Sequence, residues 1–456
     1  MKVKIDRNQI AITLAFCSLI LLRVATAPTA TLSFLILAAY ATLGRAQAIK
    51  ALSLCWLFTM VNPGLAPGAS FSSIGRYMVF LGAFIAVFAR TGIRSGSLTS
   101  SGIVLSTVGL GVFIMIHSMF ASPMPDVSIL KAVSWLVVTA TLFSAWSGLS
   151  SGDREKLFRH LYLGLVAIMA VSLPLFVLPL GYLRNGSGFQ GILNHPQAFG
   201  PTMAILGAIA ASKLFSEKRP SWQYLGIFGV SLLFIMASEA RTAGLALVIG
   251  LCMAIASVPV LSGRRIRAVL PGLRSRRVWG IAGVALYLGV VFAPQIGDKV
   301  GHYISKSGRA GSVESIAEAY NKSRGGLIDR MFVNIRENPL TGIGFGIASE
   351  PDLMVVERDP LLGLPIGAPV EKGVLPLATL EELGWVGATI VVLWMMALVV
   401  RASQNGVVSI SVLATALLIN MGENVFFSPG GMGLFVLIGV TWAATRVYRE
   451  QTGEFK

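Results

Sequence analysis

Long apolar runs separated by short polar segments follow one another from Ile10 to Val447. Their lengths are those of helices that cross a lipid bilayer, and continuous rather than alternating hydrophobicity favours helices over a β-barrel. The predicted fold class is therefore all-α, a polytopic transmembrane helix bundle of roughly 12–14 spans. The predicted spans are 9–25, 28–44, 50–62, 75–89, 101–120, 128–147, 157–181, 198–214, 222–237, 241–262, 278–295, 376–400, 406–421 and 429–446. Two short ones, 50–62 and 406–421, are candidates for re-entrant or merged segments.

One long polar interruption divides the apolar pattern. We divide the chain into N-terminal spans (1–183), spans that carry polar motifs at their ends (184–295), a loop of relatively polar composition (296–375) and C-terminal spans (376–456). Within the loop, SVESIAEAYNKSRGGLIDRMFVNI has apolar positions at helical spacing, and ENPLTGIGFG then predicts a turn that ends the helix. The loop is therefore expected to contain one or two amphipathic helices lying over the membrane domain.

Composition agrees with a membrane protein. Hydrophobic residues make up 54% of the chain and charged residues only 13%, too few to cover the surface of a soluble domain of 456 residues. The N-terminal MKVKIDR with its apolar run predicts a retained first helix, because no small-residue cleavage site stands out. Three scattered cysteines and four histidines without metal-ligand spacing predict neither disulfides nor a metal site, and no cofactor is expected.

The chain has a net charge of +16, and the uneven distribution of its basic residues along the sequence indicates how the spans are oriented in the membrane. With the N-terminus in the cytoplasm, 23 of the 37 Lys and Arg residues but only 6 of the 21 acidic residues fall on the cytoplasmic side. This positive-inside pattern places both termini in the cytoplasm, and the basic segments also suit anionic lipid head groups. It argues against nucleic acid as a partner.

Four short segments then face the extracytoplasmic side: YLRNGSGFQGILNHPQ (182–197), ASEART (237–242), SRGGLIDR (323–330) and EKGVLPLATLEELGWVG (371–387). Ionisable groups at a membrane boundary are costly and tend to mark a functional site. Arginines from separate segments suit a diphosphate, since guanidinium binds phosphate oxygens bidentately and stays charged. The candidate site residues are Arg184, Asn194, His195, Gln197, Glu239, Arg241, Arg324, Arg330, Glu371, Lys372 and Glu382.

Each candidate also has a purely structural interpretation. Arg241 at a helix end can snorkel or pair with Glu239. His195 can belong to a helix start in which Asn194 caps the first turn and Pro196 is the first helical residue. Arg324 and Arg330 can form the solvated face of an amphipathic helix, and Glu382 can stabilise the positive end of a helix.

The order of these motifs resembles the O-antigen ligase and polymerase family. The likeness covers about residues 184–400 and consists of G-x-x-N-H-P-Q-x-x-G, S-E-A-R-T, R-x14-P-L-x-G-x-G and L-E-E-L-G-W-V-G. Members of that family are membrane glycosyltransferases with a fold similar to the GT-C class. They take a glycan from an undecaprenyl diphosphate carrier on the outer face of the cytoplasmic membrane, and transfer it to an acceptor hydroxyl.

The resemblance implies particular roles for the matching residues. Arg241 matches the arginine of the S-R-T segment, and Arg324 lies fifteen residues before Pro339 of P-L-x-G-x-G. Both are expected to bind the diphosphate as catalytic residues, because fixed cations stabilise the charge that develops on the leaving group. The remaining candidates, apart from Glu371, are expected to bind substrate.

Three departures from the family pattern change the expected chemistry. The ligase-type His-Asn pair before the glutamate is replaced by Gly373 and Val374, so Glu371 is the nearby candidate for a general base. S-R-T carries an inserted acid, and P-N becomes P-Q. The loss of the histidine favours a polymerase that elongates O-antigen or exopolysaccharide repeats over a ligase that joins the glycan to a lipid A core or another acceptor.

A third function, of another class, is a transporter of lipid-linked sugars. Inverted repeats and broken mid-membrane helices are typical of such proteins, and the sequence contains no clear internal repeat. The expected partners of the polymerase are an undecaprenyl-diphosphate-linked glycan, an acceptor glycan or lipid, membrane lipid and a chain-length regulator. Its expected location is the bacterial inner membrane, with the active site on the periplasmic face.

Overall fold

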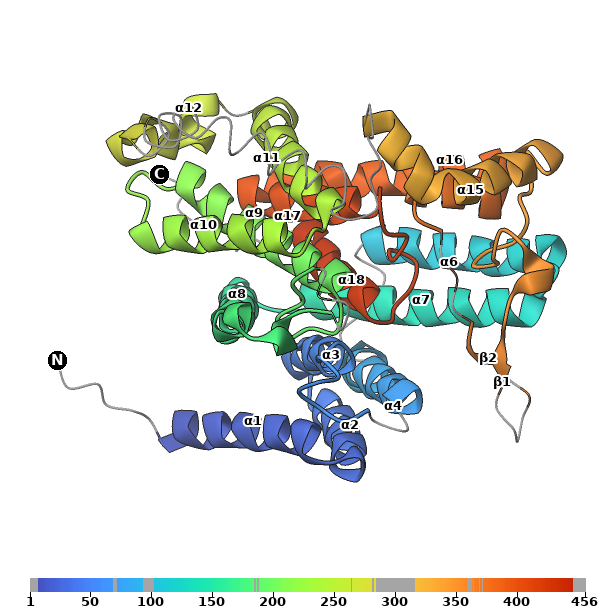
Figure 1. The fold of residues 1–456 in the computed structure, drawn as a ribbon, viewed down its shortest axis with the longest axis horizontal. Coiled ribbons are helices and arrows are strands. Elements are labelled where there is room, and N and C mark those ends of the chain that lie inside the picture. Colours follow the sequence, from blue (N-terminus) through green and yellow to red (C-terminus); the bar gives the residue numbers. More distant parts are fainter. Residues whose placement is uncertain are drawn as a thin grey trace, which may run out of the picture.

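The computed structural model describes residues 7–68, 72–92, 102–183, 186, 188–263, 265–280, 283, 316–358, 363, 365–368, 370 and 372–445. Helices make up most of this part of the chain, in agreement with the predicted all-α class (Figure 1). The first half contains α1 (Arg7–Ala25), α2 (Ala27–Ala41), α3 (Arg45–Thr59), α4 (Ser72–Phe84), the π-helix η1 (Ile85–Gly92), α6 (Gly102–Ala121), α7 (Pro125–Ser147), α8 (Ser151–Ser172), and the 3-10 turns η2 (Pro174–Val177) and η3 (Pro179–Gly181).

The second half continues the bundle and adds a short hairpin. Its elements are α9 (Pro196–Ser216), α10 (Trp222–Ala237), α11 (Arg241–Ser262), α12 (Ile266–Val269), η4 (Pro271–Arg274), α15 (Ile316–Glu337), η5 (Pro351–Leu353), β1 (Glu357–Arg358), β2 (Pro365–Gly367), α16 (Leu375–Asn405), α17 (Val407–Ile419) and α18 (Met432–Ala444). Every predicted span except 278–295 overlaps one of these helices, but 75–89 is divided between α4 and η1, and 157–181 extends past the end of α8 into η2 and η3; most of 278–295 lies outside the described residues. The amphipathic helix predicted around 312–335 is α15.

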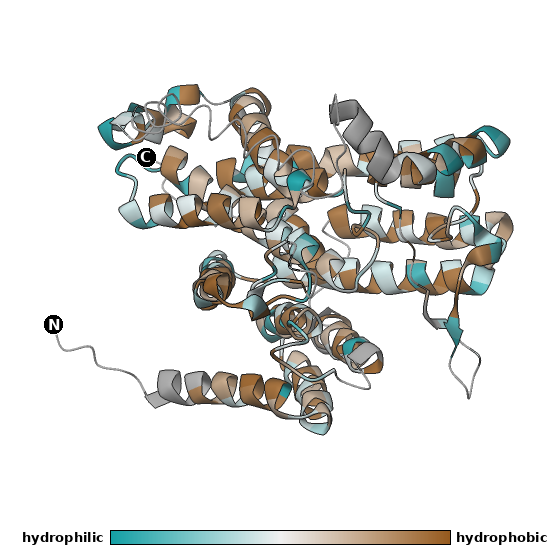
Figure 2. Cartoon of the chain, in the orientation of Figure 1, coloured by the Kyte–Doolittle hydropathy of each residue, from teal (hydrophilic) through white to brown (hydrophobic). Residues whose placement is uncertain are grey.

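Six of the described helices have the length and apolar composition needed to cross a membrane. They are α6, α7, α8 with its 3-10 extension, α9, α11 and α16. Among the shorter apolar helices, α10, α17 and α18 pack against these six, whereas α2 packs against α1, α3 and α4. Large apolar side chains such as Leu105, Phe120 and Val177 are exposed, and brown apolar bands cover the helices in Figure 2. Exposed apolar surface of this extent suits contact with lipid tails rather than with water.

The bundle core lies where helices distant in the sequence pack against each other. α9 packs against α10, α11 and α17, and α16 packs against α17 and α18, while α6 and α7 lie side by side (Figure 1). Large side chains fill these contacts, among them the buried Trp135, Trp146 and Phe199. Phe189, Phe199 and Phe234 form one aromatic cluster, with ring centroids about 5 Å apart.

Contacts between helix termini define two ends of the bundle. At the first, which we call the motif end, the chain after α3 meets the start of α9, since Asn194 N donates to Met60 O over 2.8 Å. The end of α6 also reaches the loop before α16, where His117 Nε2 and Thr341 O are 2.5 Å apart. The starts of α7, α9, α11 and α16 gather at this end, as does the β1–β2 hairpin, which Arg358 ties to Asp126 over 2.6 Å.

The opposite end, which we call the basic end, holds the other helix termini. Arg154 at the start of α8 donates to Trp442 O at the end of α18, and Asn405 donates to Ala443 O over 2.8 Å. In Figure 1, α12 at this end lies at the upper left and the β1–β2 hairpin of the motif end at the lower right. Lys and Arg outnumber Asp and Glu at the basic end, in agreement with the charge asymmetry found in the sequence.

Candidate functional site

The first two motif segments contact each other directly. α10 ends at Ala237 and α11 begins at Arg241, so ASEART forms a tight turn between two antiparallel helices. Phe189 N donates to Ala237 O over 2.9 Å. Gly200 of α9 packs against this turn so closely that a Cβ there would lie 2.6 Å from Ser238 Oγ. Small residues in both motifs therefore allow the 188–200 segment and the ASEART turn to form one unit.

His195, and not Asn194, caps α9. His195 has extended φ/ψ angles, and its Nδ1 accepts a hydrogen bond from Gln197 N over 3.1 Å, while Pro196 is the first helical residue. The expectation that Asn194 caps the first turn is therefore wrong by one position, because the imidazole nitrogen takes the place of a carboxamide oxygen. His195 and Gln197 are exposed at the motif end, and Asn194 is half-buried.

Arg241 is the first residue of α11 and is half-buried. Its backbone N–H donates to Glu239 O over 3.0 Å, and Glu239 itself has a φ of 55°. A left-handed conformation is uncommon for a residue with a Cβ and costs roughly 1–3 kcal/mol. The strained turn brings Arg241 to the positive end of the α11 dipole, where a guanidinium and helix N–H groups together favour an anion.

The turn between α17 and α18 connects ASEART with the remaining motifs. Gly422 in this turn packs directly against Thr242 of α11. Asn420 O, two residues earlier, accepts a hydrogen bond from Leu375 N at the start of α16 over 2.9 Å. Phe427 stacks edge-on against Phe345, with ring centroids 5.6 Å apart. The starts of α11 and α16 therefore lie on two sides of one turn.

The P-L-T-G-I-G segment (339–344) is bound to the backbone of α16 where this helix is kinked at Gly384. Ile343 N donates to Glu381 O over 2.9 Å, and Gly344 N donates to Glu382 O over 3.0 Å. These carbonyls are available because Gly384, with φ 62° and ψ −175°, interrupts the α-helical hydrogen bonds. The kink thus frees backbone carbonyl groups of α16 to accept hydrogen bonds from the loop.

Four charged side chains beneath this loop form what we call the charged cluster: Lys131 of α7, Lys372, Glu381 and Glu382. Lys372 Nζ lies 2.7 Å from Glu381 Oε2 and 3.1 Å from Glu382 Oε1. Lys372, Glu381 and Glu382 expose only 1%, 0% and 5% of their surface. Lys131 Nζ donates to Gly346 O over 2.6 Å, while Glu382 Oε2 accepts from Gly346 N over 2.7 Å.

Two neutral side chains add hydrogen bonds to the charged cluster. Asn334 of α15 donates to Glu381 Oε1 over 2.6 Å and to Ser349 O over 2.8 Å. Ser349 Oγ donates to Glu381 Oε2 over 3.2 Å. Two cations thus balance two carboxylates, which offsets the high cost of removing charge from water. The cluster joins α7, α15, the loop and α16 into one assembly.

Replacing Gly384 is expected to disrupt this assembly. A side chain at Gly384 would require an unfavourable φ and would overlap the Leu340 carbonyl oxygen, so Gly384→Ala is expected to cost at least about 1–3 kcal/mol. The measurement is thermal unfolding of the purified protein in detergent. Gly226→Ala in α10 is the matched control, because nothing lies within 4 Å of a Cβ there. Equal stability of the two variants would contradict the docking role of the kink.

The structure gathers some predicted site residues and leaves others outside its description. Lys372 and Glu382 are brought together with Glu381, and Lys131 bonds to Gly346 O beside them, so the charges of the cluster balance without a substrate. Arg330 faces Glu350, with Nε and Oε1 3.9 Å apart and both side chains about half exposed, so this pair contributes little stability. Arg184 and Glu371 lie outside the described residues, as does the side chain of Arg324, whose backbone belongs to α15. Convergence of Arg241 and Arg324 stays a prediction.

The fold brings to the motif end several polar residues that the sequence motifs do not include. Lys131 lies in an apolar span and Asn334 in an amphipathic helix, and only their isolated polar character was a signal. Arg76 of α4 is half-buried; its Nε atom is buried and finds no hydrogen-bond acceptor among the described residues. Its guanidinium lies over the Tyr77 ring and against Gly430, before α18. Arg76 is thus a further cation at the end that holds Arg241.

Among the described residues, no group of three or more His, Cys, Asp or Glu side chains has the arrangement of a metal site. Comparison of the chain with models of known protein families gives no match, and a search of curated proteins gives none either. The chemistry of the motif end is therefore the basis on which a function is assigned.

Proposed function

We propose that the chain is a membrane glycosyltransferase that polymerises undecaprenyl-diphosphate-linked oligosaccharide repeats. One observation carries the proposal: motif segments that are far apart in the sequence lie at one end of the bundle. The 188–200 segment contacts ASEART, the α17–α18 turn joins ASEART to the start of α16, and P-L-T-G-I-G is bound to α16. The motifs that carry the family resemblance thus share one location, as parts of a single site must.

The proposed reaction is a single displacement at the anomeric carbon of the donor sugar. The acceptor hydroxyl oxygen forms the new glycosidic bond while the bond between that carbon and the diphosphate oxygen breaks. Both electrons of the broken bond leave with undecaprenyl diphosphate, and the hydroxyl proton passes to the Glu371 carboxylate. Arg241 and Arg324 bind the diphosphate and stabilise the negative charge that grows on it.

The charged cluster has a positioning role in this scheme. Arg324 lies on α15, and Asn334 of the same helix bonds to Glu381, so the cluster fixes α15 against the start of α16. Glu371 directly precedes Lys372, whose side chain is held by both glutamates. In the proposal, the cluster determines where the diphosphate-binding helix and the general base lie, while Glu239 and the exposed His195 and Gln197 contact the substrate.

The full proposed architecture has roughly 12–14 membrane spans and a GT-C-like arrangement, with residues 296–375 as the external loop. The surplus of Lys and Arg at the basic end supports a cytoplasmic location for that end under the positive-inside rule. The motif end then faces the periplasm, where flipped lipid-linked repeats are available. The bacterial inner membrane is the proposed location.

Polymerase and ligase activities are separated by the acceptor that the purified protein requires. Given an undecaprenyl-diphosphate-linked repeat alone, a polymerase joins repeats into longer chains and releases undecaprenyl diphosphate. We expect this result because Gly373 and Val374 replace the ligase-type His-Asn pair. Product formation only after addition of a lipid A core would identify a ligase instead. Movement of the intact lipid-linked repeat across a vesicle membrane, without any new glycosidic bond, would identify a transporter.

Glu371→Gln is expected to lower turnover without weakening donor binding. The amide cannot take the hydroxyl proton, so kcat should fall by about 10²- to 10⁴-fold while the Kd for the lipid-linked donor stays unchanged. Single-turnover kinetics and an equilibrium binding assay measure the two quantities separately. Unchanged kcat would show that the base is another residue, and weaker binding with normal kcat would assign Glu371 to substrate recognition.

A further inference from the structure

A dense group of arginines lies at the basic end, on the opposite side of the bundle from the proposed active site. The segment from 265 to 279, which we call the basic segment, follows α11 and contains no acidic residue. All five of its arginines are exposed, and none forms an ion pair with a carboxylate of the described residues. They are Arg265, Arg267, Arg274, Arg276 and Arg277.

The basic segment is fixed to the bundle through its backbone and its apolar residues. Leu270 is buried, and Gly272 packs directly on the carbonyls that end α9. Arg277 Nη1 donates to Pro220 O over 3.1 Å, and its guanidinium lies 5.7 Å from the ring centroid of Trp222. The backbone that carries the exposed arginines is therefore fixed beside the membrane-length helices α9 and α11.

Aromatic and aliphatic side chains are exposed between these arginines. Trp222 and Trp279 expose 59% and 65% of their surface, and Ile266 is also exposed. The Trp279 indole N–H donates to Leu273 O over 2.6 Å, which fixes the orientation of the ring. Exposed tryptophans next to arginines are typical of the layer where lipid head groups meet the acyl chains. This composition favours a lipid ligand over a nucleic acid.

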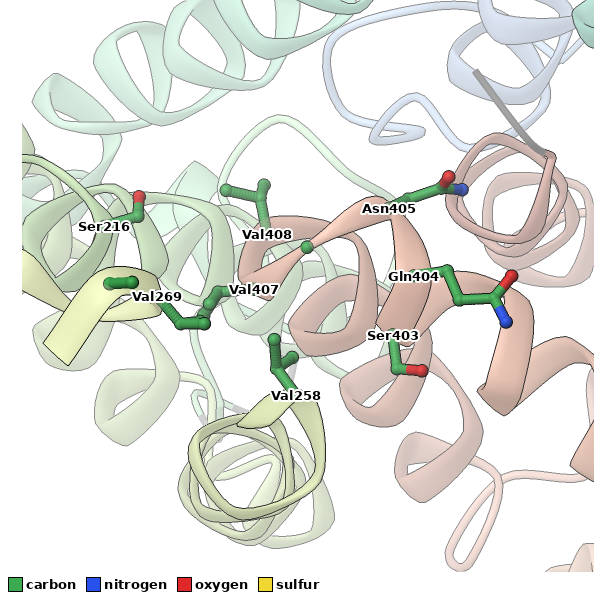
Figure 3. A pocket seen from close by; sticks show the side chains of 10 residues that line it. Ser216, Val258, Val269, Ser403, Gln404, Asn405, Val407 and Val408 are labelled. Atoms are coloured by element: carbon green, nitrogen blue, oxygen red, sulfur yellow. The ribbon is translucent and has the colours of Figure 1, made fainter. Parts of the chain in front are cut away.

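A cavity of about 260 Å³ opens next to the basic segment. Valines from three elements, Val258, Val269 and Val407, surround it, while Gln404 and Asn405 at the end of α16 lie to one side (Figure 3). Ala268 and Val269 directly follow Arg267, so one wall of the cavity belongs to the same short helix as that arginine. The cavity is smaller than a typical pocket for a complete small molecule and suits part of a larger one.

We propose that the basic segment and this cavity bind an anionic phospholipid of the surrounding leaflet. Arg265 and Arg267 hold the head-group phosphate, and the cavity takes the glycerol ester region, where apolar and polar atoms meet. The charge complementarity is strong, since each basic residue near an anionic membrane surface contributes about fivefold in affinity. The site is independent of the proposed glycosyl transfer, because it lies at the other end of the bundle.

The test is native mass spectrometry of the purified full-length chain in detergent, titrated with phosphatidylglycerol or with phosphatidylcholine of the same acyl chains. We expect tighter binding of phosphatidylglycerol, and inorganic phosphate should not displace it. The double variant Arg265→Gln, Arg267→Gln should bind phosphatidylglycerol about 25-fold more weakly. The matched control is Lys156→Gln, Arg159→Gln, which removes two exposed cations from α8 at the same end and should bind normally.

A second variant tests the cavity without changing the charge. Ala268 is exposed on the short helix α12, so Ala268→Trp is expected to fill the cavity without repacking the core and to weaken phosphatidylglycerol binding. Equal binding of the two lipids would overturn the proposal. An equal loss in the α8 control would show general charge attraction instead of a site. Normal binding by Ala268→Trp would likewise contradict the assignment of the cavity. Unfolding temperatures confirm that each variant is folded.

Discussion

Arg241→Ala is expected to abolish glycan elongation while the protein still inserts and folds. Arg241 begins α11 at the motif end, where the positive end of the helix dipole and the guanidinium both favour an anion. Loss of a fixed group that stabilises the leaving diphosphate is expected to lower kcat by about 10²- to 10³-fold or more. The measurement is the length distribution of glycans made by the purified variant from a lipid-linked repeat.

Two comparisons make this prediction specific. Arg241→Lys should also be strongly impaired, because an ammonium does not replace the bidentate guanidinium. Arg324→Ala should match Arg241→Ala if both residues hold one diphosphate. Arg159→Ala at the basic end is the control and should retain activity, since Arg159 is an exposed arginine far from the motifs. Normal chain lengths in Arg241→Ala would remove this residue from the mechanism.

Lys372→Met is expected to cause the largest loss of stability among single substitutions in the loop region. It leaves Glu381 and Glu382 buried side by side without their shared cation. Breaking a buried ion pair by removing one partner costs about 3–5 kcal/mol, because the remaining charge is uncompensated. The measurement is the unfolding temperature in detergent, together with protease cleavage of the 339–346 loop.

The control for this prediction is Lys156→Met, which removes an exposed lysine from α8. The triple variant Lys372→Met, Glu381→Gln, Glu382→Gln should regain part of the lost stability, because no buried charge is then left without its partner. If Lys372→Met is as stable as the control, the charged cluster does not hold the loop. If the triple variant is no better than the single one, packing rather than charge accounts for the loss.

The helices were predictable from the sequence because continuous hydrophobicity determines where they form. Apolar runs such as 128–147 and 376–400 must be helical in a bilayer, where backbone groups find no water. The structure accordingly places α7 and α16 there. The end of α15 was also predictable, since ENPLTGIGFG combines proline and glycine directly after the amphipathic pattern. Local pattern and local structure coincide in these places.

The charged cluster was not predictable, because its members come from separate elements. Lys131 and Lys372 are 241 positions apart, and only packing brings Lys131 to Gly346 and Lys372 to Glu382, two residues that are themselves joined by a hydrogen bond. The kink at Gly384 is equally a tertiary feature, since the same L-E-E-L-G-W pattern also suits an unbroken helix. His195 as the cap of α9 was missed for a local reason: imidazole is a rarer cap than the neighbouring asparagine.

The motif end is expected to bind a lipid-linked diphosphate. The most direct measurement is an experimental structure of the full-length protein with an undecaprenyl-diphosphate-linked repeat. We predict the diphosphate beside Arg241 at the start of α11, within hydrogen-bond reach of Arg324, with the first sugar directed towards Glu371. A diphosphate bound at the basic end, or at the motif end without contact to either arginine, would contradict the proposed site.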